Sequence, residues 1–366
     1  MNRIFLSPPH MSGKERHYIA EVFDSNYIAP LGAFVDRFER MVCDYTGVGY
    51  ALATNTATAA LHLALRVLGI DEGDYVLASS FTFIGSVNAI LYQKAQPIFV
   101  DSDEGWNLSP RLLKEAIVSA PRKPKALIVT HLYGQMAKMD EIVEICKNEG
   151  IFIIEDAAES LGSTLHRRQS GTLGDLGVYS FNGNKILTTS GGGMLVSDNE
   201  AWIQKAKFYA TQAKEDTLHY EHKEYGYNYR MSNVLAAIGV AQMEVLQDRI
   251  VRKREIFKHY KTLLGEMEEI SFMPEIEGSE GNRWLTTLTF DRSDPFAVMR
   301  RLEAENIESR PLWKPMHLQP LFRDATAAVD GTSEALFKKG ICLPSGTAMT
   351  SSDVERIAHI VKRALI

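Results

Sequence analysis

The residue whose position first suggests chemistry is Lys185, a lysine in a small polar loop. It ends the sequence Gly-Val-Tyr-Ser-Phe-Asn-Gly-Asn-Lys at residues 177–185. Upstream, the apolar run at residues 151–154 leads directly into Glu155 and Asp156. A lysine amine can form a Schiff base with pyridoxal phosphate (PLP), and an aspartate can keep the ring nitrogen of that cofactor protonated. Taken singly, each residue is better explained as a solvated lysine or a helix N-cap, so the hypothesis depends on their surroundings.

The elements that would position this pair alternate along the chain from about residue 57 to 200. Leu61, Leu65 and Leu68 recur at helical spacing, whereas short, nearly continuous apolar runs are typical of buried strands. The predicted helices cover residues 57–68, 83–92, 110–119 and 138–148, and the predicted strands cover 75–78, 97–100, 126–130, 151–154, 177–181 and 194–197. This alternation predicts an α/β fold with a mostly parallel central sheet covered on both faces.

A second, smaller domain is predicted after residue 246. Ser232 is a candidate N-cap for one long helix that runs to about residue 267, long enough to connect two domains. We therefore expect a large domain at residues 1–245 and a small C-terminal α/β domain at residues 246–366. The small domain would hold a strand at 284–290 and helices at 295–305 and 351–365.

Composition excludes several classes of protein. The chain has 366 residues, 45% hydrophobic and 23% charged, with a net charge of −6. This is an ordinary globular balance, and the charge gives no reason to expect a nucleic-acid partner. No apolar run reaches membrane-spanning length, and the first residues lack a signal-peptide pattern. The three cysteines are far apart and odd in number, which favours reduced thiols and a cytoplasmic protein.

Three further segments could contribute to a cofactor site. Thr56 and Ala57 stand at the start of the first predicted helix of the sheet domain, where free backbone N–H groups suit a phosphate. Phe83 follows a strand and could stack on a flat ring. Glu159 lies three residues after Asp156 and would share its face if a helical turn begins there. Plain N-capping, core packing and a surface carboxylate are the ordinary alternatives.

The densest polar and aromatic stretch is Tyr-Gly-Tyr-Asn-Tyr-Arg-Met-Ser-Asn at residues 225–233. Loops of this composition often carry binding groups. Asn228 could donate to a phosphate and Arg230 could pair with an anionic substrate. The alternative is a turn that only precedes a helix.

Other chemistries lack their signatures. The segment that begins Gly47-Val48-Gly49 lacks the third glycine of a dinucleotide fingerprint and does not follow a strand. The acidic end of the 151–156 segment could suggest the Walker-B strand of a nucleoside triphosphatase, but no phosphate-binding loop accompanies it. His219 and His222 show no convincing spacing for a metal, and we expect no metal site.

Together these segments resemble the DegT/DnrJ/EryC1/StrS family of sugar-nucleotide aminotransferases, which are fold-type I PLP enzymes. The resemblance runs from about Leu6 to the end of the chain. Its carriers are Asn-Thr-Ala-Thr-Ala-Ala-Leu-His-Leu-Ala-Leu (55–65), His-Leu-Tyr-Gly (131–134), Glu-Asp-Ala-Ala-Glu (155–159), Tyr-Ser-Phe-Asn-Gly-Asn-Lys (179–185), Gly-Tyr-Asn-Tyr-Arg-Met-Ser-Asn (226–233) and Arg-Pro-Leu-Trp-Lys-Pro-Met-His (310–317).

The resemblance implies a role for the residues around the cofactor ring. Lys185 would hold PLP and move the proton, Asp156 would pair with the ring nitrogen, and Phe83 would stack on the ring. Many members carry glutamine at the position of Glu159, near the cofactor hydroxyl. Some members replace the lysine with histidine and act as dehydratases, so Lys185 favours amino transfer.

The resemblance also implies a phosphate site that two subunits share. Thr56, the backbone of Ala57, and Ser180 would hold the phosphate of PLP. Asn228 would complete the phosphate site of the neighbouring subunit, which makes the expected assembly a homodimer with shared active sites.

A closer likeness suggests the substrate. Residues 7–13, 25–32 and 340–349 resemble the C4-aminotransferases of the UDP-N,N′-diacetylbacillosamine pathway of protein glycosylation. This likeness implies transfer of an amino group from L-glutamate to UDP-2-acetamido-2,6-dideoxy-4-keto-glucose. The candidate substrate-binding residues are His10, Arg230, Trp313 and His317.

Three alternatives stay open at this point. The chain could aminate C3 or C4 of another nucleotide-linked keto-deoxysugar. It could be a non-catalytic regulator that binds PLP on the same fold. It could also be an NAD-dependent sugar oxidoreductase, which the missing glycine fingerprint disfavours.

Overall fold

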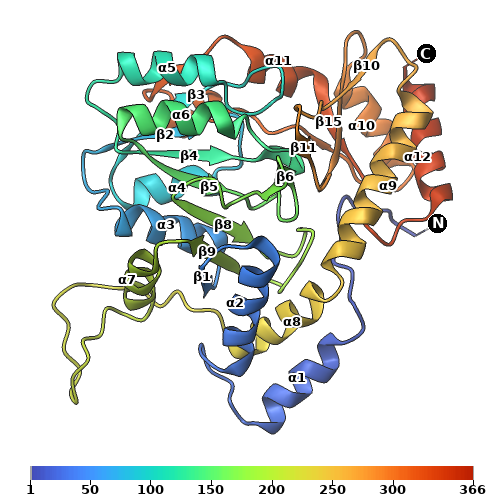
Figure 1. Ribbon diagram of the computed structural model, residues 1–366. Helices are drawn as coiled ribbons and strands as arrows, with labels where there is room; N and C mark the ends of the chain where they lie inside the picture. Colours follow the sequence, from blue (N-terminus) through green and yellow to red (C-terminus); the bar gives the residue numbers. More distant parts are fainter. Residues whose placement is uncertain (1, 366) are drawn as a thin grey trace.

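The computed structural model describes residues 2–365 and is built around one eight-stranded sheet (Figure 1). The strand order is β1-β9-β8-β5-β4-β2-β3-β14. Strand β9 pairs antiparallel with β1 and β8, and all other neighbours pair parallel. The strands are β1 (Tyr50–Thr54), β2 (Tyr75–Ser79), β3 (Gln96–Val100), β4 (Ala126–Thr130), β5 (Phe152–Asp156), β8 (Leu176–Ser180), β9 (Gly193–Ser197) and β14 (Thr326–Ala328). The predicted mostly parallel sheet is confirmed.

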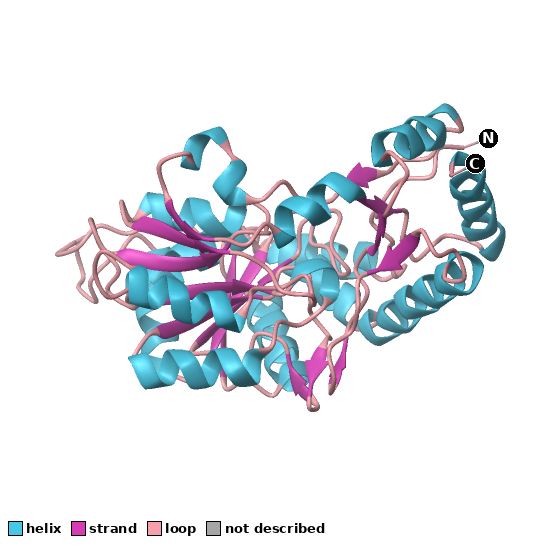
Figure 2. Cartoon of the chain, turned by 90° about the horizontal axis from the view of Figure 1, so that it is seen from above, coloured by secondary structure: helices cyan, strands magenta, loops and turns pink. Residues whose placement is uncertain are grey.

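Helices cover both faces of this sheet (Figure 2). Helices α3 (Ala57–Val67), α4 (Gly85–Tyr92) and α7 (Glu200–Ala210) pack on one face, and α5 (Pro110–Ser119) and α6 (Met139–Glu149) pack on the other. Successive strand side chains point to opposite faces, so Val76 and Ala78 enter the first core while Leu77 enters the second. Burial on both faces explains why these strands are continuously apolar.

The long helix predicted from Ser232 is wrong, because the structure contains two helices there. Ser232 caps α8 (Asn233–Met243), which packs against α1 (Glu15–Asp24) and α2 (Ala33–Thr46). Val245 has φ −117° and ψ 7°, which breaks the helix before α9 (Leu246–Leu264) begins. The break lets α9 turn into a separate core, in which Ile256, Tyr260 and Leu264 are buried.

That separate core belongs to a second, four-stranded antiparallel sheet of order β10-β12-β15-β13. Its strands are β10 (Ile270–Phe272), β12 (Thr286–Phe290), β13 (Arg310–Pro311) and β15 (Gly340–Leu343), and its helices are α10 (Pro295–Ala304), α11 (Thr332–Lys339) and α12 (Ser351–Ala364). The remaining short elements are β6 (Thr164–Leu165), β7 (Arg168–Gln169), β11 (Ser279–Glu280) and the 3-10 turns Leu132–Gly134, Met316–Leu318 and Pro320–Phe322.

Two short segments cross the predicted division at residue 246. Ile4 forms a bridge with Ile307 and packs in the core of the second sheet. Strand β14, from the C-terminal part, pairs with β3 at the edge of the large sheet. The division into residues 1–245 and 246–366 stays a prediction, and these two segments tie the parts together.

The segment between α7 and α8 projects from the body of the molecule (Figure 1). Leu218 and Tyr220 lie on it with nearly fully exposed side chains. None of the helices within residues 2–365 has both the length and the apolar character that crossing a membrane requires.

Candidate active site

A cavity of about 250 Å³ lies where the parallel strands of the large sheet end. Parallel strands bring their carboxyl ends to one edge of a sheet, and ligands of such folds bind there. The cavity is lined by eight of the residues predicted from sequence, namely Thr56, Ala57, Phe83, Asp156, Glu159, Ser180, Lys185 and Trp313. The structure therefore brings together segments that are far apart in the sequence.

Lys185 projects into this cavity from the loop after β8. Its Nζ atom lies 3.6 Å from Oε1 of Glu159 and 4.0 Å from the centre of the Trp284 ring. The indole Nε1 of Trp284 donates a hydrogen bond of 2.8 Å to the carbonyl of Asn184, the preceding residue. A carboxylate and an aromatic face therefore hold the amine, and the same tryptophan holds its loop.

Asp156 is the last residue of β5, and two hydrogen bonds fix its carboxylate. Oδ2 accepts from the hydroxyl of Ser86 at 2.5 Å, and Oδ1 accepts from the backbone N–H of Ala158 at 3.1 Å. A carboxylate has more acceptor positions than these two bonds occupy. Asp156 can therefore accept a further hydrogen bond from a group in the cavity.

Glu159 reaches the same cavity from a turn, not from the helical turn that its spacing suggested. Its Oε2 accepts a 2.6 Å hydrogen bond from the backbone N–H of Tyr133. Burial raises the pKa of Glu159, Lys185 opposes that shift, and the nearby Asp156 carboxylate adds to it. Burial outweighs the attraction of the lysine because the side chain is almost fully enclosed.

The N-terminus of α3 forms the opposite wall. Thr56 is its N-cap and accepts from the N–H of Ala59 at 3.0 Å, which leaves the N–H groups of the first turn directed at the cavity. Gly193 makes this approach possible, since a Cβ there would lie 2.4 Å from the backbone nitrogen of Ala57. Ser180, at the end of β8, also lines this part of the cavity.

Aromatic rings form the remaining wall. Phe83 is 54% exposed and its ring lies 5.3 Å from that of Trp313, whereas Phe81 is buried in the core. Tyr133 lies between two tryptophans, 6.4 Å from Trp313 at 8° and 6.5 Å from Trp284 at 17°. The Nε1 of Trp313 is buried without a hydrogen-bond partner, so it has a free donor.

These side chains fit PLP. The helix N-terminus with Thr56 and Ser180 suits a phosphate, Asp156 suits a protonated ring nitrogen, and Lys185 supplies the amine. When bound, PLP supplies an electron-accepting ring that stabilises negative charge on the carbon next to the transferred amine. With PLP bound, the residues of the chain would hold the ring, exclude water with the aromatic wall, and move the proton at Nζ of Lys185.

A larger outer cavity of about 910 Å³ adjoins the first, and Asn184, Trp284 and Trp313 line both. Its wall also includes residues 5–9 of the N-terminal segment, together with Arg310 and Lys314. Arg310 is paired with Glu308 at 2.9 Å. Across residues 2–365, no carboxylate oxygen lies within 4.0 Å of the Lys314 amine, so this cation can receive an anion.

Two predicted residues of the Tyr-rich stretch do not line either cavity of their own chain. Asn228 is exposed, and its carbonyl accepts from the side chain of Asn55 at 3.3 Å. Arg230 is buried and its guanidinium lies 3.1 Å from Glu39. Their proposed ligand contacts stay predictions.

His10 and His317, the two histidines predicted to bind substrate, form hydrogen bonds with other side chains of the protein. Nδ1 of His10 lies 2.9 Å from the hydroxyl of Thr347 and 2.8 Å from the guanidinium of Arg249. His317 lies 2.6 Å from the hydroxyl of Ser80, and burial lowers its pKa. Neither lines the two cavities, although His10 borders a small space behind Lys185.

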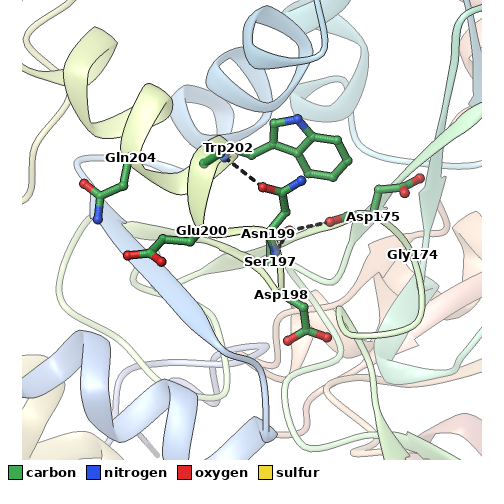
Figure 3. A pocket seen from close by; sticks show the side chains of 9 residues that line it. Gly174, Asp175, Ser197, Asp198, Asn199, Glu200, Trp202 and Gln204 are labelled. Carbon is green, nitrogen blue, oxygen red and sulfur yellow. Dashed lines mark hydrogen bonds between the residues drawn. The ribbon is translucent and has the colours of Figure 1, made fainter.

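Another hollow lies near the opposite end of β8 and β9 (Figure 3). Asp175, Asp198 and Glu200 give it an acidic lining, and Trp202 covers one side. It contains none of the predicted site residues. Among residues 2–365, no group of acidic, histidine or cysteine side chains is arranged to hold a metal ion.

Sequence reasoning missed the functional positions of Trp284, Tyr133 and Lys314. Tyr133 lies within the His-Leu-Tyr-Gly segment and Lys314 follows Trp313, so both were adjacent to recognised signals. Trp284 was assigned to a strand, and its contact with Asn184 spans 100 positions in the sequence. No local pattern predicts such a contact.

A parallel sheet with a lysine, an aspartate and a helix N-terminus at one edge defines the class of PLP-dependent aminotransferases. The chain belongs to the DegT/DnrJ/EryC1/StrS aminotransferase family, whose model matches residues 9–362. It is 53% identical to the putative PLP-dependent aminotransferase EpsN of Bacillus subtilis, over 98% of this chain and 95% of that protein. It is 37% identical to GDP-perosamine synthase of Escherichia coli O157:H7, over 99% and 98% of the two chains.

The same architecture occurs in solved structures. The crystal structure of the aminotransferase TlmJ from Streptoalloteichus hindustanus is similar with a TM-score of 0.93 and 28% identity, over 99% of this chain and 98% of that chain. The chain is therefore an enzyme, a PLP-dependent aminotransferase that acts on nucleotide-linked sugars. Membership of this family excludes the NAD-dependent oxidoreductase and the non-catalytic regulator.

Proposed function

We propose that the enzyme transfers an amino group from L-glutamate to C4 of UDP-2-acetamido-2,6-dideoxy-4-keto-glucose and gives the UDP-4-amino sugar. The observation that carries this proposal is that the cavity lined by Lys185 adjoins the outer cavity through a shared wall of Asn184, Trp284 and Trp313. The inner cavity matches the cofactor, and the outer cavity has the volume and the mixed aromatic and cationic lining that suit a nucleotide sugar.

Lys185 and Asp156 are the proposed central residues. Lys185 would bind PLP through its amine and would carry the proton that amino transfer requires, while Asp156 would pair with the ring nitrogen. Phe83 covers the ring. Thr56 and Ser180, together with the N–H of Ala57, hold the phosphate.

Contacts to the substrate are proposed on the shared wall. The free Nε1–H of Trp313 can donate to a sugar or phosphate oxygen, and its ring can pack on the sugar. The unpaired amine of Lys314 can meet the diphosphate. His10, Arg230 and His317 remain predicted substrate contacts without a place in either cavity.

The choice of C4, UDP and L-glutamate rests on the likeness of residues 7–13 and 25–32 to that group of enzymes. Relatives named GDP-perosamine synthase support the alternative that another nucleotide-linked keto-deoxysugar is aminated, at C4 or at C3. Incubation with L-glutamate and either the 4-keto or the 3-keto UDP-sugar, followed by NMR of the product, tests the position of the new amine. Faster conversion of the 3-keto compound would reject C4.

Two further arms of that experiment test the base and the donor. A GDP-linked 4-keto-6-deoxyhexose should react at least about tenfold more slowly than the UDP-linked acetamido sugar. The two compounds differ both in the nucleotide base and in the acetamido group on the sugar. L-Glutamine and L-aspartate replace L-glutamate in parallel reactions. Equal rates with the GDP-sugar would reject the assignment of UDP, whereas the activity as a nucleotide-sugar aminotransferase would be unaffected.

We also propose a homodimer with shared active sites. Asn228 is exposed and away from its own cofactor cavity, which is the arrangement expected if it serves a neighbouring subunit. The projecting segment beside it and the 27–31 region expose large apolar side chains, and these are Tyr27, Ile28, Leu31, Leu218 and Tyr220. Exposed apolar side chains in such number suit an interface.

Mixed dimers test the sharing. Lys185→Ala chains and Asn228→Ala chains are each expected to be nearly inactive, but a mixed dimer holds one site that neither change touches. Mixing should therefore restore activity, up to one working site in every mixed dimer. A lack of rescue in confirmed mixed dimers would show that each site is built from one chain.

The proposed location is the cytoplasm. All three cysteines are free, and Cys146 and Cys342 are buried. Reduced thiols of this kind suit a reducing compartment.

A further inference from the structure

A second lysine, Lys253, lies behind the cofactor cavity. It is on α9, and its side chain is buried with 2% of the residue exposed. Its amine donates to the carbonyl of Trp284 at 2.8 Å and to the hydroxyl of Ser7 at 3.1 Å. Within the described residues, no carboxylate is paired with it, so neutral oxygens are its hydrogen-bond partners.

A buried lysine without a carboxylate is costly to retain. Burial lowers the pKa of Lys253 to about 7. A methionine or leucine at this position of α9 would fill the same space without desolvating an amine. Packing alone therefore does not explain why a lysine occupies this position.

The contacts of Trp284 supply that reason. Its carbonyl accepts from Lys253, its indole N–H donates to the carbonyl of Asn184, and its ring lies 4.0 Å from the amine of Lys185. One chain of contacts thus runs from α9 to the PLP-binding amine. The two lysines also border the same space of about 10 Å³, which is close to the size that holds one water molecule.

We propose that Lys253 is a positioning residue for Lys185 and acts through Trp284. The ammonium or amine of Lys253 fixes the backbone of Trp284, so that the indole stays against Nζ of Lys185 and keeps its hydrogen bond to Asn184. Because α9 and Trp284 belong to the C-terminal part and Lys185 to the N-terminal part, the contact also couples the two parts at the reacting amine. The inference rests on the proposed role of Lys185 in binding PLP.

Several other titratable groups lie near Lys253 and would also contribute to the pH dependence of PLP recapture. Lys185 and His10 face Lys253 across the shared space. Behind them, Arg249 contacts His10, and Glu15 contacts Gln242, which lines the same space. A pH profile therefore needs the variants below to separate Lys253 from these groups.

The test measures how the protein stripped of cofactor recaptures PLP, followed by the appearance of its visible absorption band. The variant Lys253→Met should slow recapture about tenfold or more at neutral pH and change the pH dependence of its rate, because the amine of Lys185 is no longer held in place. Lys258→Met, on the exposed side of the same helix, is the matched control and should behave as the wild type. Wild-type recapture and an unchanged pH profile in Lys253→Met would overturn the proposal.

A double-mutant cycle tests the route through Trp284. Trp284→Leu removes the aromatic face, and Lys253→Met added to it should cause no further slowing, since the two changes break one chain of contacts. Trp284→Phe keeps a ring but loses the hydrogen bond to Asn184 and should slow recapture by itself. Additive effects in the double variant would reject the route, and a wild-type rate in Trp284→Phe would do the same if Lys253→Met failed to fold.

The outcome can be told apart from a failure of the proposed function. Lys185→Ala should lose the covalent PLP band altogether. If that variant kept the band, the assignment of Lys185 would fail first. If it lost the band while Lys253→Met was normal, only the inference about Lys253 would fail.

Discussion

The cofactor cavity and the outer cavity share a wall, but they differ in whether their polar groups are already hydrogen-bonded to the protein. In the cofactor cavity, backbone N–H groups fix Asp156 and Glu159 with hydrogen bonds of 3.1 and 2.6 Å. On the outer side, among residues 2–365, no carboxylate oxygen lies within 4.0 Å of the Lys314 amine and no acceptor faces Nε1 of Trp313. The inner carboxylates are arranged in advance for one resident ligand, whereas Lys314 and Trp313 of the outer wall keep unengaged donors for ligands that exchange.

The largest expected effect tests the inner cavity. Lys185→Ala removes both the amine that binds PLP and the group that moves the proton, so turnover should fall by at least about 10³-fold. The fold should persist, because the Nζ contacts found within residues 2–365 are those with Glu159 and the ring of Trp284. Steady-state rates and circular dichroism check both parts, and full activity would contradict the assignment.

Asp156→Asn should give the next largest effect. The variant keeps the shape of the side chain and one oxygen that can accept from the N–H of Ala158, but its amide NH2 cannot accept from Ser86 and its charge is lost. We therefore expect kcat to fall about 100-fold while PLP still binds. Asp198→Asn, in the acidic hollow at the far end of the sheet, is the control and should leave kcat within about twofold. If both variants behaved alike, the distinction between the two ends of the sheet would be lost.

Trp313→Phe probes the shared wall with a smaller change. The lost N–H has no partner in the protein, so thermal stability should change by less than about 0.5 kcal/mol. One hydrogen bond to the nucleotide sugar should be lost, which raises KM about fivefold with little change in kcat. Substrate-saturation curves and thermal unfolding of the same sample test this, and an unchanged KM would remove Trp313 from the substrate contacts.

Glu159→Gln tests the inner cavity through the pH dependence of the free energy of unfolding. Burial raises the pKa of Glu159 in the folded protein above its unfolded value, so its protonated form favours folding and this contribution is lost as pH rises through the folded pKa. Glutamine cannot ionise. Between pH 4 and pH 8, the free energy of unfolding of the PLP-free variant should therefore rise relative to that of the wild type. Denaturant unfolding at the two pH values measures it, and a change of the opposite sign would mean that the attraction of Lys185 dominates.

The large sheet was predictable because its signals are local. Helix α5 (Pro110–Ser119) and strand β4 (Ala126–Thr130) begin and end at the predicted residues, since a proline, a capping serine and a short apolar run mark them. The break at Val245 was not predictable, because no glycine or proline marks it and the packing of α8 and α9 in different cores decides it. Tertiary packing overrides local propensity at that point.

The candidate site divides in the same manner. Asp156 and Lys185 follow strands, so their meeting at one edge follows from the topology of parallel strands. Trp284 and Lys253 approach the site from the C-terminal part of the chain, and Arg230 pairs with Glu39. Such contacts depend on how two parts of the chain dock, and hydrophobic periodicity carries no information about docking.

The three residues of β14 have a consequence for how the protein is made. Thr326–Ala328 cover the edge of β3, next to the buried ring of Phe99, which lies 5.1 Å from Phe322. A ribosome produces β3 long before it produces β14, so the nascent chain carries an open strand edge beside an apolar surface during most of its synthesis. Open edges of this kind recruit other strands and lead to aggregation. Shortened versions of the protein that end before residue 326 should therefore collect in inclusion bodies, even though they contain every residue that lines the cofactor cavity.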